Sequence, residues 1–158
     1  MNYIKKFESF KDGYNLFMAI RDGNFNLVET IIKSGIDANG KDDADSRSFL
    51  MLACSMSNSD DEFNNKYVEI AKMLIDAGAN LDEQDKDGYT ALNWAAYGRN
   101  INAVKLLIES GANWNLEDHD NRDFLDYLIG ENRINIIELY PEQYKEYLMK
   151  KNAKKYNL

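Results

Sequence analysis

Carboxylates that could bind a metal ion occur at alternate positions in the run Glu83–Gly88, directly before a glycine. A calcium-binding loop begins with the same pattern. The twelfth position of such a loop must supply a bidentate carboxylate, and that position is Trp94 here. We therefore predict that Glu83–Gly88 is the tip of a hairpin. The acidic clusters within 42–45 and 60–62 are interpreted as solvated loops, because divalent-ion sites need converging ligands.

Nucleophilic and zinc chemistry have few candidate residues. His119 is the only histidine and Cys54 the only cysteine, so the usual zinc ligand sets cannot be assembled. We expect His119 at a hairpin tip without a buried partner, which argues against a Ser-His-Asp arrangement. The chain also has no glycine-rich phosphate loop. We therefore expect a non-catalytic protein with no cofactor and no metal, and we keep a hydrolase or metal-dependent enzyme as a third hypothesis.

Length and composition indicate one intracellular domain. The chain has 158 residues, of which 44% are hydrophobic, and this is enough for a real core. It has no apolar run long enough to cross a membrane, and its first residues lack the apolar segment of a secretory signal. A single cysteine cannot form an internal disulfide, which favours a reducing compartment. We expect a cytoplasmic protein that does not enter a membrane.

The net charge of -8 is unevenly distributed along the chain. Residues 1–11 carry +2 and residues 144–158 carry +4, so residues 12–143 carry -14. An acidic body repels nucleic acid and favours basic protein surfaces. The alternative interpretation is that the charge serves solubility alone.

The elements expected to position these side chains are pairs of short helices that end at glycines. In the first pair, the apolar residues of Phe25–Ile32 share one face of a helix that ends at Gly35. The same pattern precedes Gly78 and Gly111, which are 33 residues apart, whereas Gly35 and Gly78 are 43 apart. We assign the difference to an insertion of nine residues within 57–67 and of one residue in the preceding hairpin.

The stretch Asp87–Asn115 is the best-formed unit of this pattern. It contains an Asp87-Gly88 turn, Thr90-Ala91-Leu92-Asn93, an Ala95-Ala96 pair, Leu106-Leu107-Ile108, and Gly111-Ala112-Asn113-Trp114-Asn115. This order resembles an ankyrin repeat, and a period near 33 with two short helices and a turn is typical of that family. The resemblance covers roughly 14–140. It implies an all-α ankyrin-repeat solenoid of about four helix-turn-helix repeats joined by hairpin-like loops, with N- and C-terminal capping segments.

The helix starts depart from the family pattern, because every copy lacks the family's proline and histidine. In the family, that histidine helps to tie neighbouring loops together. Asn93 and Asp126 could form substitute hydrogen bonds, whereas Phe17 and Met51 could not. We therefore expect lower stability than in regular members of the family, and an irregular hairpin at Gly40–Arg47.

The pattern divides a single domain, residues 1–158, into consecutive segments. Residues 1–13 are an N-terminal cap or tail, and 141–158 are a C-terminal capping helix. The repeats lie at 14–36, 37–79 (with the insertion at 57–67), 80–113 and 114–140.

Several apolar residues are assigned to the core of these repeats. Pro141 is interpreted as the stop that follows the last repeat. The other assigned residues are Cys54, Trp94 and Trp114 as packing residues, Leu125, Leu128 and Ile129 in the first helix of the last repeat, and Ile134, Ile137 and Leu139 in its second helix.

The resemblance implies that a partner binds to the hairpin tips and to the exposed face of each first helix, which together form a concave surface. Tyr and Arg are enriched among interface anchors. Tyr89, Tyr97, Arg47 and Arg122 are therefore the first choices, although each could be an ordinary surface residue. Carried over by position, the candidate residues are Arg47, Met56, Lys86, Asp87, Tyr89, Tyr97, His119, Asp120 and Arg122.

The insertion at 57–67 is a second candidate site, because loops of extra length often carry function. Phe63 and Tyr67 would be the anchors of this secondary binding loop. The alternative is that the insertion lengthens both helices of its repeat by a turn.

Two functional hypotheses therefore rank above the enzyme hypothesis. The first is a monomeric protein-binding module, a scaffold or inhibitor whose partner is a protein with a basic surface and not a nucleic acid. The second is an acidic mimic that blocks a nucleic-acid-binding protein. Heavy use of Asn, Lys, Ile and Tyr favours an AT-rich genome, such as that of a virus or bacteriophage. The target would then be a host protein in the host cytoplasm.

Overall fold

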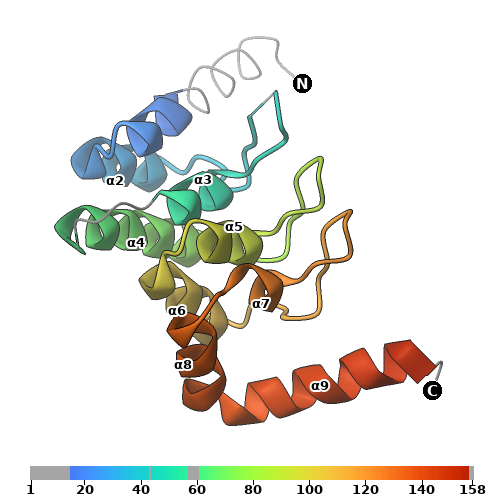
Figure 1. Ribbon diagram of the computed structural model, residues 1–158. Helices are drawn as coiled ribbons and strands as arrows, with labels where there is room; N and C mark the ends of the chain where they lie inside the picture. The colour runs from blue at the N-terminus through green and yellow to red at the C-terminus, as the bar shows by residue number, and fades with distance from the viewer. Residues whose placement is uncertain (1–14, 43, 57–60, 157–158) are drawn as a thin grey trace.

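The computed structural model describes residues 15–42, 44–56 and 61–156. The predicted N-terminal cap or tail at 1–13 lies outside these residues. Residues 15–21 are helical and pair with α2 (Phe25–Lys33). Three further pairs follow, and a long helix completes the described chain (Figure 1). These helices are α3 (Phe49–Ser55) with α4 (Asp61–Asp76), α5 (Ala91–Tyr97) with α6 (Ile101–Glu109), α7 (Phe124–Tyr127) with α8 (Glu131–Leu139), and α9 (Pro141–Tyr156).

The helix pairs stack in sequence order, which confirms the predicted all-α solenoid. The helices α3, α5 and α7 form one row, and α2, α4 and α6 form a second row behind it. Hairpins between the pairs all project to the same side of the stack (Figure 1). The core between the rows includes Ala95, Ala96 and Cys54, each fully buried. Burial raises the pKa of the Cys54 thiol to about 12, which fits the predicted packing role.

Among residues 15–42, 44–56 and 61–156, no helix combines the length and the apolar character needed to cross a bilayer.

Polar N-caps begin the helices of the first row. Ser48 caps α3, Thr90 caps α5 and Asp123 caps α7, and each side chain accepts a hydrogen bond from a backbone N–H of the first turn. These N–H groups have no partner within the helix, so the caps stabilise its start. At α3 the Met51 thioether also accepts a hydrogen bond from the Ser48 N–H at 3.4 Å. The prediction that Met51 could form no substitute hydrogen bond is therefore wrong.

The three hairpins share one backbone pattern. The N–H of Asp85 donates to the carbonyl of Tyr89, and the N–H of Asp118 donates to the carbonyl of Arg122, at 3.0 and 2.9 Å. In the first hairpin the equivalent bond joins Asp42 to Arg47, so this hairpin is one residue longer. The one-residue insertion inferred from the spacing is therefore located in the 42–47 hairpin.

Gly88 lies where successive hairpins approach most closely. Its φ is +84°, and a Cβ at this position would lie 3.0 Å from the Asp118 Cα and from the His119 N. We expect Gly88→Ala to lower the free energy of unfolding by about 1–2 kcal/mol for the left-handed backbone, plus the cost of displacing the next hairpin. Urea denaturation of both variants would measure this.

Gly111→Ala is the matched control, because Gly111 has φ +92° with no atom within 4 Å of the added Cβ. It should lose only the backbone contribution. Equal losses in the two variants would contradict a steric role of Gly88 between the hairpins.

The predicted insertion changes only one helix. The helix α4 has 16 residues, against nine in α2 and in α6, whereas α3 and α5 have seven each. Residues 57–60 of the predicted insertion lie outside the described residues, and 61–67 belong to α4. A binding loop at 61–67 and a lengthening of both helices are therefore wrong. Phe63 and Tyr67 belong to α4. Tyr67 is 3% exposed and its hydroxyl donates to the Arg21 carbonyl at 3.0 Å, so it packs inside the stack and cannot anchor a partner.

The last helix pair is shorter than predicted. The N-caps of α7 and α8 are seven residues apart, whereas those of α5 and α6 are ten apart. Because α7 ends at Tyr127, Ile129 lies beyond it and is 58% exposed. The shorter connection also changes which side of α8 faces the core. Ile136 is fully buried, and Ile137 packs against the core as predicted. Ile134 and Leu139 are more than half exposed, so the predicted face of α8 is wrong at these two residues.

The helix α9 begins at Pro141, which therefore starts a helix and does not merely end the repeat. The Tyr147 hydroxyl and the Lys151 ammonium both donate to Oδ2 of Asp123, at 2.8 and 2.6 Å. Trp114 is buried beside Tyr147, in agreement with its predicted core role. These contacts attach α9 to the last hairpin, and the helix runs beneath the hairpins (Figure 1).

Candidate functional site

Five side chains from successive helix pairs meet at the junction of hairpins and first-row helices. Arg47, Tyr89 and Arg122 each directly precede the N-cap of a first-row helix. Trp94 and Tyr127 each follow the N-cap by four residues, one helical turn further on. Stacking of α3, α5 and α7 therefore brings these equivalent positions side by side.

These five side chains form one stacked series, which we name the aromatic column. The guanidinium carbon of Arg47 lies 5.6 Å from the Trp94 ring centroid, and that ring lies 5.2 Å from Tyr89. Tyr89 lies 5.5 Å from Tyr127, and the Arg122 guanidinium lies 5.1 Å from Tyr127. Rings and guanidinium groups at such distances attract each other through the ring quadrupole. The column is therefore ordered by its own contacts.

Trp94 lies at the edge of the core, where it packs against buried residues and also forms part of this surface. It is half-buried, and its indole Nε1 donates to Oδ2 of Asp85 at 2.8 Å. The predicted packing role is therefore correct only in part, because the ring also turns toward the hairpin carboxylate, where its N–H finds an acceptor.

Tyr97 is the exposed member of the site. Its ring lies 6.0 Å from both Trp94 and Tyr127 and is nearly perpendicular to each, and 62% of the residue is exposed. The equivalent position in the last pair, seven residues after the N-cap, is Gly130, beyond the end of α7. No side chain of the next pair therefore stands at the equivalent position beside Tyr97.

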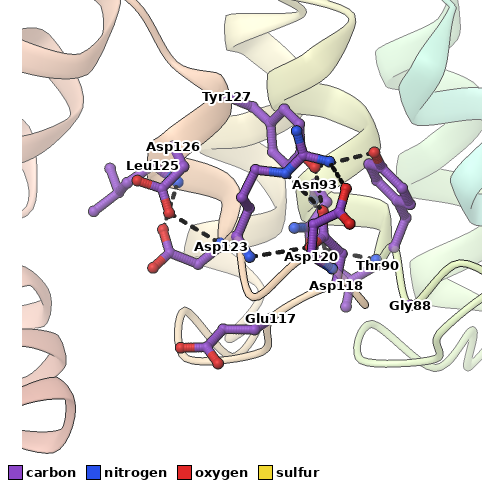
Figure 2. A network of polar contacts seen from close by, with 12 residues as sticks. Gly88, Thr90, Asn93, Glu117, Asp118, Asp120, Asp123, Leu125, Asp126 and Tyr127 are labelled. Atoms are coloured by element: carbon purple, nitrogen blue, oxygen red, sulfur yellow. Dashed lines mark hydrogen bonds and ion pairs between the residues drawn. The ribbon is translucent and has the colours of Figure 1, made fainter. Parts of the chain in front are cut away.

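Two buried carboxylates position rings of the aromatic column through hydrogen bonds. In Asp85 and in Asp118, Oδ1 accepts two backbone N–H groups of the same hairpin at 2.8–3.0 Å. Oδ2 of Asp85 holds Trp94, and Oδ2 of Asp118 accepts the Tyr127 hydroxyl, which also lies 3.0 Å from the Tyr89 hydroxyl. Figure 2 shows the network around Asp118 and Tyr127. Each carboxylate thus fixes both a hairpin and a ring.

The electrostatics of this network keep Asp118 ionised and Tyr127 protonated. Burial raises the pKa of Asp118, but the Tyr127 hydroxyl, two backbone N–H groups and Arg122 outweigh it, and the net pKa is lowered. Burial raises the pKa of Tyr127, and its hydrogen bonds to Asp118 and Tyr89 raise it further. The hydroxyl therefore remains a donor to the carboxylate at physiological pH.

The hairpins around the column are acidic, and their described cations are already paired. Among the described residues of 42–47, 85–89 and 118–122, six carboxylates face three cations. Arg47 pairs with Asp42 and Asp45, and Lys86 also pairs with Asp45. Arg122 pairs with Asp118 and Asp120.

The structure brings some of the predicted binding residues together and separates others. Lys86, Asp87, His119 and Asp120 are exposed on hairpin tips, where the His119 N–H donates to the Asp87 carbonyl at 3.0 Å. Met56 is half-buried at the far end of α3 and takes no part in the column.

Tyr127, Asp85 and Asp118 were not predicted as site residues. A signal for them exists in the sequence, because Trp94 and Tyr127, like Asp85 and Asp118, are one 33-residue period apart.

Within the described ranges, no three His, Cys, Asp or Glu side chains are grouped as a metal site would require. Both oxygens of Asp85 in the calcium-like run are used in hydrogen bonds.

Comparison with known proteins agrees with the repeated geometry. A family model described as ankyrin repeats (3 copies) matches residues 62–151, more than half of the chain. A search of curated proteins found no match. The matched region contains α4 from Glu62 onward, the α5–α6 pair, the α7–α8 pair, and α9 as far as Lys151. The chain belongs to the ankyrin-repeat family.

Proposed function

We propose that this protein is a non-catalytic binding module whose aromatic column and Tyr97 contact a partner protein. Ankyrin repeats are generally protein–protein interaction modules and are typically non-catalytic. Binding at this face would let the protein act as a scaffold or an inhibitor. The predicted secondary site at Phe63 and Tyr67 has no part in this proposal.

The observation that carries the proposal is the exposed ring of Tyr97 on a pre-ordered support. Its neighbours Trp94 and Tyr127 are fixed by Asp85 and Asp118, so little side-chain freedom is left to lose on binding. Binding costs less when anchors are pre-organised, and tyrosine offers a large contact area with few rotatable bonds. Exposed aromatic side chains of this kind are common interface anchors.

The partner surface is proposed to be basic, and the protein to act as a monomer. The excess of carboxylates on the hairpins would steer a positively charged partner to the column and would repel nucleic acid. Such long-range steering falls with added salt, because the Debye length is about 8 Å at physiological ionic strength.

The test is a capture experiment from source-cell or host-cell extract with wild type, Tyr97→Ala and Tyr156→Ala. Tyr156 is the matched control, because it is 64% exposed but lies on α9. For a captured protein that is then purified, Tyr97→Ala should weaken binding at least about tenfold, and Tyr156→Ala should not. A partner retained equally by all three proteins would remove this face as the binding site.

The acidic-mimic alternative makes a different prediction about salt. A mimic of nucleic acid replaces many phosphates, so the logarithm of its affinity should fall steeply with the logarithm of salt concentration. The proposed binding through aromatic anchors should show a shallow slope. A slope as steep as that of nucleic acid for the same partner would favour the mimic.

A further inference from the structure

We propose that the partner segment bound at this face carries arginine, and that its guanidinium group stacks on the ring of Tyr97. This inference rests on the proposed function, because it names the chemistry of the partner at the same face.

The first support is that the face already binds two guanidinium groups in this way. Arg47 lies over Trp94 and Arg122 over Tyr127, and each is also paired with two hairpin carboxylates. The surface therefore repeats one arrangement, in which a guanidinium meets a ring and a pair of carboxylates. These two arginines occupy the ends of the aromatic column.

The second support is that the arrangement is incomplete at Tyr97. Trp94 and Tyr127 meet this ring nearly at right angles, and among the described residues no cation lies over it. The ring is also 62% exposed, so it can be reached from solvent. The Tyr97 ring is thus available for one more cation.

The third support is that the described hairpins offer no unpaired cation to an anionic partner. The described cations of the three hairpins, Arg47, Lys86 and Arg122, are all paired with carboxylates. An acidic segment would have to break these pairs and would face an excess of negative charge. Charge complementarity therefore selects a cationic segment.

Arginine suits this position better than lysine. Its guanidinium is planar and weakly hydrated, so it can stack on a ring while its N–H groups bind carboxylates. A lysine ammonium is compact and strongly hydrated, and its stacking contribution is smaller. The binding free energy of an exposed guanidinium–ring contact is enough to favour an arginine segment over a lysine segment by about threefold to fivefold in affinity.

The experiment compares labelled decapeptides of arginine, lysine and glutamate by fluorescence anisotropy with the full chain. The arginine and lysine peptides carry equal charge, so their affinity ratio removes the contribution of charge alone. We expect the arginine peptide to bind about threefold to fivefold tighter than the lysine peptide, and the glutamate peptide not to bind. Tyr97→Ala should abolish this preference, while Tyr97→Phe and Tyr156→Ala should keep it.

The outcomes separate this inference from the proposed function. If both basic peptides bind equally and Tyr97→Ala weakens both, the face binds partners but the arginine preference is wrong. If Tyr97→Ala leaves both affinities unchanged, both proposals fail. A preference for arginine that persists in Tyr97→Ala would also overturn the inference, because the guanidinium would then be recognised elsewhere.

Discussion

Replacing Tyr67 by alanine is expected to lower the free energy of unfolding by about 3–5 kcal/mol, the range for truncating a buried aromatic ring. The ring is 3% exposed and packs 4.8 Å from Phe63. Its hydroxyl donates to the Arg21 carbonyl, where the chain turns toward α2. A change at Tyr67 therefore removes contacts both within α4 and between the first two helix pairs.

Urea denaturation and native-state hydrogen exchange would measure this effect. Tyr67→Phe removes only the hydrogen bond and should cost about 0.5–1.5 kcal/mol. Tyr97→Ala serves as the control, because the ring is exposed and should change stability by about 0.5 kcal/mol or less. In a stack, each unit is held only by its neighbours, so protection should fall first at 15–33. A loss in Tyr67→Ala no larger than in Tyr97→Ala would contradict this role.

Asp118→Ala is expected to cost about 3 kcal/mol at neutral pH, because it removes the acceptor for several groups at once. The Asp118 side chain is 1% exposed and accepts hydrogen bonds from Asp120, Arg122 and Tyr127. Alanine would leave two backbone N–H groups and the Tyr127 hydroxyl without this acceptor. Asp120→Ala is the control, because it removes an exposed ion pair to the same arginine, worth about 1 kcal/mol or less.

The contribution of the Asp118 charge should depend on pH. Its pKa is lowered in the folded state, so the stabilisation is complete above the unfolded-state value of about 3.9 and is lost as pH falls through the folded value. The stability difference between wild type and Asp118→Asn should therefore shrink as pH falls below about 4. Denaturation curves at several pH values would show this. A difference that stays constant into strong acid would mean that the charge contributes nothing.

The repeat architecture could be predicted from the sequence because the residues that define it act locally. Ser48 and Thr90 are good caps in any context, and their first-turn N–H groups need an acceptor wherever the helix lies. The 33-residue spacing then places equivalent residues side by side. The hairpin at 42–47 follows from the same counting, because an extra residue there must lengthen a turn.

The local side-chain environments could not be predicted in the same way. Trp94 has a core-like position in the repeat, but its indole N–H requires an acceptor, and Asp85 supplies it on the hairpin side. The sequence predicts Tyr67 as an anchor of a binding loop, because loops of extra length often carry function. In the structure residues 61–67 belong to α4, where the tyrosine reaches a carbonyl 46 residues earlier in the chain. Such long-range partners are not visible in local periodicity.

The last helix pair shows how a small deletion changes many assignments. Three fewer residues between the N-caps of α7 and α8 rotate α8, so that Ile136 and not Ile134 faces the core. Apolar spacing alone fits both registers. The same deletion leaves Tyr97 uncovered, which connects an irregular terminal repeat with the proposed binding face.

The attachment of α9 has a mechanical consequence. A pulling force applied at Tyr156 would act first on the bonds of Lys154 to Glu117 and of Lys151 and Tyr147 to Asp123, which would break one after another. After these bonds break, the 16 residues of the helix could lengthen from about 24 Å to about 53 Å as the helix unfolds. Unfolding of the last helix would thus limit the tension that the aromatic column experiences.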